Sequence, residues 1–195
     1  MDILWGIDYG KKLSGNTVIC QKKGSEVNFF KVGINQDADQ FILDHMHKHQ
    51  PDVIFIDAPL SLPAAFYDPE KHDNYFFRRC DQELGAMSPM FLGGLTARAI
   101  RLKTIIEKQG IIIRETYPKA LARRMGLKEQ GYRQGKEHIS GCIDRLEEIA
   151  HLEVDHGALQ SWHHLDALLA LVSAIRFEQS LGFTFGDAGE GLIYL

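Results

Sequence analysis

The 195-residue chain lacks features that would place it in several broad classes of protein. It has no apolar run near the roughly 20 residues of a membrane-spanning helix. It also has no basic start or small-residue cleavage site of the kind that marks a signal peptide. Its three cysteines lie far apart and form no CxxC pair, which argues against a disulfide framework and a zinc ribbon. We therefore expect a cytoplasmic protein with reduced cysteines and no membrane partner.

A marked excess of basic residues is also missing, because the net charge is −4. Hydrophobic residues make up 45% of the chain and charged residues 25%, the proportions of an ordinary globular protein. The charge is nevertheless uneven. Residues 95–136 contain eleven Lys or Arg and three Glu, so this segment carries +8 and the rest of the chain, by subtraction, −12. Such asymmetry indicates either a phosphate-facing surface or solvated helix faces, and both interpretations stay open.

The first third of the chain has the pattern of strands interrupted by one helix. Apolar runs at residues 2–8, 17–20 and 27–32, separated by turn-forming residues, predict a three-stranded antiparallel meander. Helical spacing of apolar residues predicts a helix over 35–49, with its first residue as the N-cap. Residues 53–57 are apolar on both faces, which is typical of a central parallel strand.

The rest of the chain alternates between helices and strands after one irregular stretch. Residues 59–94 are the least regular, with a predicted helix at 74–84, and long connections of this kind tend to form lids or binding loops. The later elements are predicted as a helix at 95–109, a strand opening at 111–113, helices at 118–125, 136–150 and 162–181, and a terminal strand at 192–194. We predict a single domain over residues 1–195. Its α/β sheet is mixed, with three antiparallel strands, then parallel crossovers, and helices on both faces, which is the ribonuclease-H-like arrangement.

Four acidic residues stand where this fold would bring them together. Asp8 and Asp57 end two neighbouring strands, Glu115 ends the next strand, and Asp166 lies on the last helix. A carboxylate beside a buried strand needs something to offset its desolvation, and the carboxyl ends of parallel strands are where ligands bind. Because converging carboxylates repel one another unless a cation lies between them, we predict that these four acids form a catalytic site that holds Mg²⁺ or Mn²⁺.

Each of these residues also has a purely structural interpretation. Asp8 and Asp57 would then only accept hydrogen bonds from turn amides, and Asp166 would be an exposed helix residue. Glu115 would pair with a neighbouring arginine. His163 precedes Asp166 by three residues and shares its helix face, so it is either a further metal ligand or a helix-surface residue. The joint placement of the acids favours the metal site.

Five short motifs around these residues occur in a recognisable order. They are Gly6-Ile7-Asp8-Tyr9-Gly10-Lys11, Ile56-Asp57-Ala58-Pro59-Leu60, Arg79-Cys80-Asp81, Glu115-Thr116-Tyr117-Pro118 and His163-His164-Leu165-Asp166-Ala167-Leu168. Together they resemble an uncharacterised bacterial and archaeal family of predicted nucleases with a ribonuclease-H fold, over nearly the whole chain. The first motif also resembles the start of a family of predicted Holliday-junction resolvases. The last helix is similar to that of the RuvC-type resolvases.

The resemblance implies a nuclease fold and suggests roles for particular residues. By this likeness Asp8, Asp57 and Asp166 match the acidic positions, and His163 matches an earlier position on the same helix. Glu115 stays open, because the strand that bears the third acid differs among relatives.

Basic and aromatic side chains near the predicted site suit a nucleic-acid partner, because cationic side chains hold phosphates. The predicted phosphate-binding residues are Arg78, Arg79, Arg98, Lys119, Arg123, Arg124 and Lys128. Aromatic residues of the 59–94 connection either stack on bases or form a hydrophobic cluster under a loop. These aromatic residues are Tyr67, Tyr75, Phe76 and Phe77.

The leading functional hypothesis is a metal-dependent nuclease that hydrolyses phosphodiester bonds, with nucleic acid as its partner and self-association left open. One alternative is a catalytically inactive binding or regulatory module with the same fold, which the net acidity of the chain favours. Another is a nucleotide-binding phosphotransferase of the actin or sugar-kinase type. That class shares the topology, but it normally needs two such domains and glycine-rich phosphate loops, and this chain has room for one domain.

Overall fold

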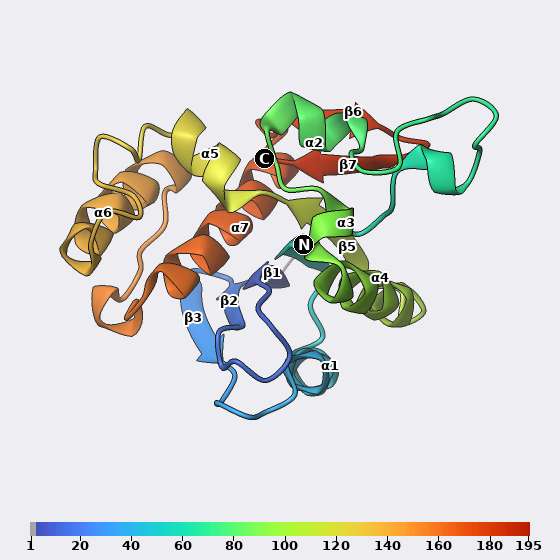
Figure 1. Ribbon diagram of the computed structural model, residues 1–195. Helices are drawn as coiled ribbons and strands as arrows, with labels where there is room; N and C mark the ends of the chain where they lie inside the picture. Colours follow the sequence, from blue (N-terminus) through green and yellow to red (C-terminus); the bar gives the residue numbers. More distant parts are fainter. Residues whose placement is uncertain (1–2) are drawn as a thin grey trace.

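The computed structural model describes residues 3–195, and its centre is a seven-stranded sheet (Figure 1). The strands are β1 (Ile3–Asp8), β2 (Val18–Lys23), β3 (Glu26–Lys31), β4 (Val53–Asp57), β5 (Ile112–Thr116), β6 (Thr184–Asp187) and β7 (Gly191–Tyr194). Their order across the sheet is β3-β2-β1-β4-β5-β7-β6.

Strands β1 to β3 form the predicted antiparallel meander, and β4 continues the sheet parallel to β1. Strands β5 and β7 extend the sheet in the same direction, and β6 pairs antiparallel with β7 at the far edge. The central strands β1 and β4 are buried on both faces, which explains their continuous apolar runs. The structure therefore confirms the predicted mixed sheet.

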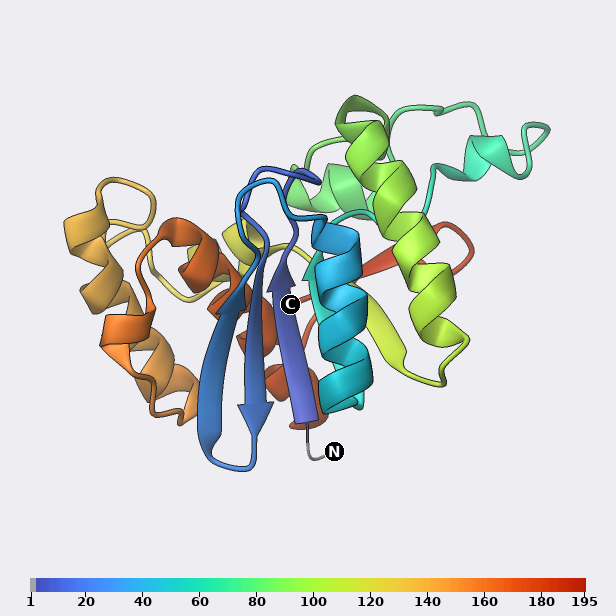
Figure 2. The same ribbon diagram turned by 90° about the horizontal axis from the view of Figure 1, so that it is seen from below.

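Helices cover both faces of the sheet, as predicted. One face carries α1 (Ala38–His49) and α4 (Gly94–Glu107), and the other carries α5 (Pro118–Arg124), α6 (Ile139–Ala150) and α7 (Trp162–Glu178). Figure 2 shows the two groups of helices on either side of the meander. Each face has its own apolar core. Ile7, Ile54 and Ile56 pack with α1 and α4, whereas Leu4 and Phe55 pack with α7.

A glycine in β1 lets α7 approach the sheet closely. A Cβ atom on Gly6 would lie 2.1 Å from the backbone nitrogen of Leu171 and 2.3 Å from the carbonyl oxygen of Ala167. Because these are backbone atoms of a regular helix, any side chain at position 6 would push α7 away from β1. The close crossing holds the first turns of α7 near the carboxyl end of β1.

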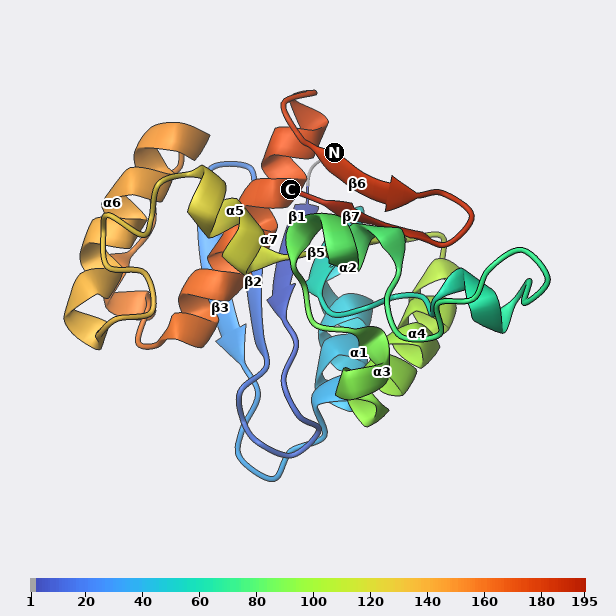
Figure 3. The ribbon, with the colours of Figure 1, turned by 45° about the horizontal axis from the view of Figure 1, so that its top comes forward.

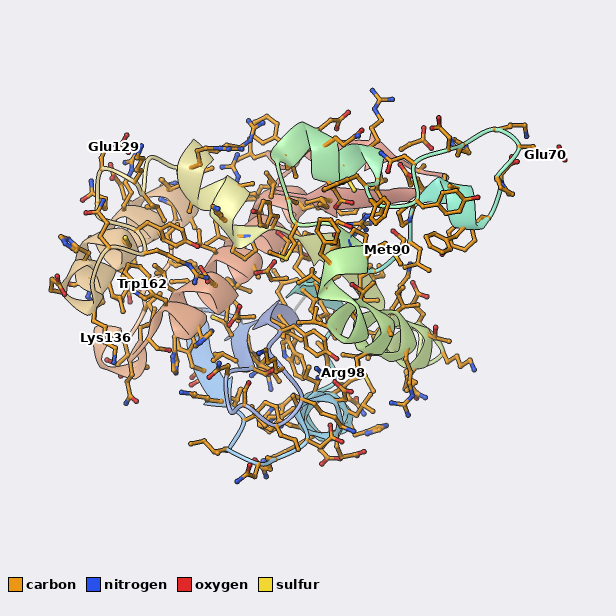
Figure 4. All side chains as sticks on the ribbon, in the orientation of Figure 1. Glu70, Met90, Arg98, Glu129, Lys136 and Trp162 are labelled. Carbon is orange, nitrogen blue, oxygen red and sulfur yellow. The ribbon has the colours of Figure 1, made fainter. Side chains whose placement is uncertain are left out.

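The irregular connection over 59–94 is anchored to the C-terminal hairpin. It contains a 3-10 turn (Ala64–Phe66) and two short helices, α2 (Arg79–Leu84) and α3 (Pro89–Leu92). The Glu190 carboxylate accepts hydrogen bonds from the backbone N–H of Ala64 at 2.8 Å and of Arg79 at 2.7 Å. Figure 3 shows α2 against the β6–β7 hairpin. Glu70, at the tip of the connection in Figure 4, lies far from α7.

Several element boundaries differ from the predicted ones. Helix α1 begins after Asp37, whose side chain caps its first turn, because Asn35 has a φ of 64° and stands outside the helix. The predicted helix at 74–84 starts only at residue 79, because the Asn74 side chain accepts two backbone N–H groups in a turn. Strand β6 was not predicted. The expected strand start at Asp2 lies outside the described residues.

The cysteines are free and buried at positions 20, 80 and 142, which agrees with the prediction of reduced thiols. Burial raises the pKa of the Cys20 thiol well above its ordinary value, so thiolate chemistry there is disfavoured. Within residues 3–195, the structure has no helix with the length and apolar character needed to cross a membrane.

Candidate metal centre

The strand register puts Asp8 and Asp57 side by side. They are partners on the adjacent parallel strands β1 and β4, each at the last position of its strand, and neighbouring strands lie about 4.8 Å apart. Alternate residues of a strand face the same side, so Asp8 shares a face with Leu4 and Gly6, and Asp57 shares it with Phe55. Both acids therefore lie on the face that α7 covers.

Helix α7 brings His163 and Asp166 to the same end of the sheet. The Nδ1 atom of His163 lies 2.7 Å from Oδ2 of Asp8, a contact that joins the first turn of α7 to β1. Asp166 follows one turn later and is fully buried. Asp57 and Asp166 line the same cavity. The four residues predicted as metal ligands thus lie in one region, which we call the acidic cluster.

The carboxyl groups of the acidic cluster repel one another. Burial, and then the charge of Asp8, raise the pKa of Asp166 to about 6. Burial and the charges of Asp8 and Asp166 raise the pKa of Asp57 well above its ordinary value. The hydrogen bond to Asp8 raises the pKa of His163, so the imidazolium form is favoured there. The three carboxylates outnumber the two cationic side chains that contact them, His163 and Arg133, and an excess of negative charge is the electrostatic condition for holding a cation.

Two residues of the loop over 126–135 hold Asp166, and sequence reasoning missed both. The Tyr132 hydroxyl donates to Oδ1 of Asp166 at 2.5 Å, and the Arg133 guanidinium forms an ion pair with Oδ2. Arg133 has a φ of 62° and a side chain that is 52% exposed, so it reaches the buried acid from the solvent side. The only signal in the sequence was that Arg133 belongs to the basic segment 95–136.

Glu115, predicted as a fourth catalytic acid, faces the opposite side of the sheet. Its partner on β4 is Ile56, and Ile113, two residues earlier on β5, lies on the same face of the sheet as Glu115. Both isoleucines pack with α1 and α4. On the α7 face, β5 instead presents Thr116, whose hydroxyl donates to Ser173 of α7 at 2.9 Å. Strand alternation therefore puts Glu115 on the other face of the sheet from Asp57, although both residues line a second cavity at this end of the sheet.

Arg78 is the partner of Glu115, and it is fully buried. Its guanidinium donates to both oxygens of Glu115 at 2.6 Å, and to Asp81 at 2.7 and 3.0 Å. Glu115 also accepts the backbone N–H of Leu60 at 2.8 Å, so this ion network ties the 59–94 connection to β5. Because these donors and acceptors are already engaged, we leave Arg78 out of the phosphate-binding set and Glu115 out of the catalytic set.

The remaining predicted phosphate-binding residues lie in different parts of the fold. Three of them, Lys119, Arg123 and Lys128, line a cavity beside the acidic cluster. Arg98, labelled in Figure 4, pairs with an acid of α1, and Arg79 pairs with an acid of its own helix. Arg124 stacks over two phenylalanine rings of the C-terminal segment. The basic segment therefore does not form one continuous surface.

The cavity has a volume of about 590 Å³. It is lined by Asp57, Leu84, Gly85, Tyr117, Lys119, Ala120, Arg123, Lys128, Tyr132, Arg133 and Asp166. Tyr117 lines this space together with Asp57, and burial and the charge of Asp57 raise the pKa of the Tyr117 phenol. We call this space the basic cavity.

The aromatic residues of the 59–94 connection pack on one another. The rings of Phe76 and Phe77 each lie 5.9 Å from Phe91, and those of Phe66 and Tyr75 lie 5.4 Å apart. None of these five rings lines the basic cavity. Their packing favours the hydrophobic-cluster interpretation for this stretch.

A second group of metal-ligand side chains lies on the outer part of the molecule. Asp144 and Glu147 of α6 and the nearby His156 have ligand atoms within 4.8 Å of one another. It is the one group of three at that spacing among residues 3–195, so no three members of the acidic cluster have ligand atoms that all lie this close together. These three side chains are partly or fully exposed, and exposed acids commonly approach one another without an ion.

The residues of the acidic cluster suit a hard divalent cation. Carboxylate oxygens are ligands that Mg²⁺ and Mn²⁺ prefer, and Mg²⁺ usually keeps several waters and binds through one or two carboxylates. The cluster can therefore accept such an ion without the tight spacing that an all-protein cage would require. Its buried, mutually repelling carboxylates would gain from the added positive charge.

No family model and no curated protein matches this chain, but several solved structures are similar to it, among them two structures of RuvC. The first is RuvC from T. thermophilus in complex with a Holliday junction substrate, with 15% identity over 92% of this chain and 97% of that chain, and a TM-score of 0.45. The second is a structure of Thermus thermophilus RuvC, with 11% identity over 91% and 96%, and a TM-score of 0.43. The fold is ribonuclease-H-like. The strand order carries that assignment.

Proposed function

We propose that this protein is a divalent-metal-dependent nuclease that hydrolyses phosphodiester bonds of nucleic acid. The observation that carries the proposal is the position of Asp8, Asp57, Asp166 and His163. They lie on one face of the sheet, at the carboxyl ends of parallel strands, and the pKa values of the two aspartates nearest the cavity are raised. Such a cluster is a marker of function rather than of stability.

The proposed roles follow from the contacts. Asp8, Asp57 and Asp166 hold the cation, which when bound supplies Lewis-acid stabilisation of the charge that develops on the phosphate. His163 orients Asp8 through the 2.7 Å contact. The imidazolium form of His163, favoured by this contact, also moderates the negative charge of the cluster.

The basic cavity supplies the contacts to nucleic acid in this proposal. Lys119, Arg123 and Lys128 would hold phosphates of the chain next to the cleaved bond. We further propose one domain over residues 1–195, which the single seven-stranded sheet supports, and a cytoplasmic location. Both the site and the cavity then belong to one structural unit.

A binding module without catalysis is the second candidate, and one contact favours it. The ion pair between Arg133 and Asp166 is the kind of interaction that fixes a buried acid structurally. In that case the loop over 126–135 would be locked on α7, and added Mn²⁺ would have no effect on the acidic cluster.

Replacement of Asp57 by asparagine tests the proposal. Asn is nearly isosteric and removes one of three repelling charges, so Asp57→Asn should match or exceed the parent in free energy of unfolding without metal. Mn²⁺ at about 100 times its Kd should raise the Tm of the parent by about 5–10 °C. That shift, and cleavage of labelled DNA and RNA oligonucleotides, should be lost in Asp57→Asn. Thermal melts and gel assays measure both.

Asp144→Asn is the matched control, because it removes an acid from the exposed group on α6. It should keep the cleavage and most of the Mn²⁺ shift of the parent. A shift that disappears in Asp144→Asn and persists in Asp57→Asn would assign the ion to the outer group and overturn the proposed metal centre. A normal shift in the parent without cleavage of any oligonucleotide would favour the binding module.

A further inference from the structure

We propose that the basic cavity binds one unpaired nucleotide of the nucleic acid chain. This inference rests on the proposed function and specifies the form of its substrate. It depends on the size of the cavity, on the side chains that line it and on its position beside the acidic cluster, each of which is an independent observation.

The size of the cavity suits a single nucleotide. Its volume of about 590 Å³ falls within the roughly 300–1,000 Å³ typical of sites that enclose one small molecule. A base that remains paired and stacked in a duplex cannot enter a space of this kind. Proteins that take a base into a pocket act on single strands or first extrude the nucleotide from the helix.

The lining combines positive charge with aromatic faces. Lys119, Arg123 and Lys128 line the cavity and are exposed to solvent. Arg133, from the loop over 126–135, is a fourth basic residue of the lining. These four cations exceed the two acids of the lining, so the cavity as a whole attracts an anion such as a phosphate. The tyrosines at 117 and 132 supply rings on which a base can stack.

The two tyrosines differ in how firmly they are held. Tyr132 is fixed at both ends, because its hydroxyl binds Asp166 and its ring lies edge-on to Trp162 at 5.5 Å. Trp162 is labelled in Figure 4, at the beginning of α7. Tyr117 stands between β5 and α5 and is half-buried, with no ring partner of this kind among the described residues. Tyr117 is therefore the better candidate for stacking on a base.

The position of the cavity connects binding with chemistry. Asp57 and Asp166 belong both to the acidic cluster and to the lining. A nucleotide that stacks on Tyr117 would consequently have its phosphates within reach of the metal centre. By contrast, the aromatic residues of the 59–94 connection lie outside this lining, so they offer a matched control surface.

Binding without cleavage tests the inference. Anisotropy of labelled DNA would be measured in EDTA with a 12-nucleotide single strand and with the blunt duplex of the same sequence. The parent should bind the single strand at least 10-fold more tightly than the duplex. Tyr117→Leu should weaken single-strand binding by about 5- to 100-fold, the range for loss of one stacked base. Tyr117→Phe should bind like the parent, and so should the control Tyr75→Leu.

Equal affinity for duplex and single strand, or equal losses in Tyr117→Leu and Tyr75→Leu, would overturn the inference. If Tyr117→Leu does not fold, the double variant Arg123→Gln, Lys128→Gln replaces it. That variant should lower the slope of log affinity against log salt concentration by about 1–2 for the single strand, and an unchanged slope would also overturn the inference.

The same proteins distinguish this inference from the proposed function. Single-strand binding through Tyr117 without any Mn²⁺ shift or cleavage would leave the nucleotide cavity standing and overturn the nuclease. Mn²⁺-dependent cleavage that proceeds normally in Tyr117→Leu, on single strand and duplex alike, would support the nuclease and overturn the nucleotide cavity.

Discussion

Two groups of buried acids lie at the same end of the sheet, on opposite faces, and their negative charges are compensated in different ways. On the α1–α4 face, Glu115 and Asp81 share the guanidinium of Arg78, which is completely buried and reaches both at 2.6–3.0 Å. Burial raises the pKa of Glu115, but the Arg78 charge and hydrogen bonds oppose this shift. On the α7 face, the acidic cluster has no buried guanidinium among the described residues, and its own cation is the partly exposed His163 imidazolium beside Asp8. The half-exposed Arg133 is the guanidinium in contact with it.

The difference separates a structural ion network from a candidate site. A buried charge is tolerated when its hydrogen bonds are complete, as they are around Arg78. Carboxylates that repel one another without a compensating cation lower the stability of the fold. Such repulsion is retained mainly at functional sites. Proximity to the basic cavity adds to this argument, because Asp57 and Asp166 line that cavity, whereas the carboxylate of Glu115 is already paired with Arg78.

Removal of the central arginine should give the largest effect. Arg78→Met leaves two buried acids without their cation, so the free energy of unfolding should fall by about 3–5 kcal/mol. Urea denaturation would measure it. Arg79→Met is the control on the neighbouring residue, whose side chain is 65% exposed and pairs with Glu83, and it should change stability by no more than about 0.5 kcal/mol. Similar losses in both variants would remove the distinction between a buried network and a surface pair.

The acidic cluster should show itself in the pH dependence of stability. Asp166 keeps its proton up to about pH 6 when folded, whereas in the unfolded chain it loses the proton near 3.8. Its stabilising contribution is therefore complete below about pH 4 and is lost as the pH rises through 6. In EDTA, the free energy of unfolding of Asp166→Asn should rise by about 1–3 kcal/mol relative to that of the parent between pH 4 and pH 7. Parallel curves for the two proteins, from urea melts at several pH values, would contradict the raised pKa.

Part of this contrast between the two groups of acids could be predicted from sequence. The rest depended on the alternation of side chains along a strand and on contacts between residues far apart in the chain. Asp8 and Asp57 follow apolar runs that both read as central strands, so their adjacency was predictable. The face of the sheet on which Glu115 lies was not predicted, because its place at a strand end was considered without strand alternation. It stands two residues after the apolar Ile113, and that spacing already indicates the α1–α4 face.

Other parts of the site had no local signal. Arg133 contacts Asp166 across 33 positions of the chain, from a loop without regular secondary structure. No periodicity assigns a partner to such a residue. The burial of Arg78 was hidden in the same way, because its partner Glu115 lies 37 positions away. Arg133 stood in the basic segment 95–136, and Arg78 stood in the irregular stretch 59–94.

The smallest predicted effect concerns Arg133, the guanidinium that contacts the acidic cluster. The Arg133 guanidinium binds Oδ2 of Asp166, an oxygen that a divalent ion would also use, so the two compete for the same charge. Arg133→Gln should therefore bind Mn²⁺ about 3- to 10-fold more tightly than the parent, measured by calorimetry or by the Mn²⁺ dependence of the Tm. Arg145→Gln, which removes an arginine paired with Glu148 on α6, should leave Mn²⁺ affinity unchanged. Weaker Mn²⁺ binding in Arg133→Gln would mean that Arg133 orients Asp166 for the ion instead of competing with it. The acidic cluster would then resemble the Arg78 network, as a site whose geometry depends on its arginine.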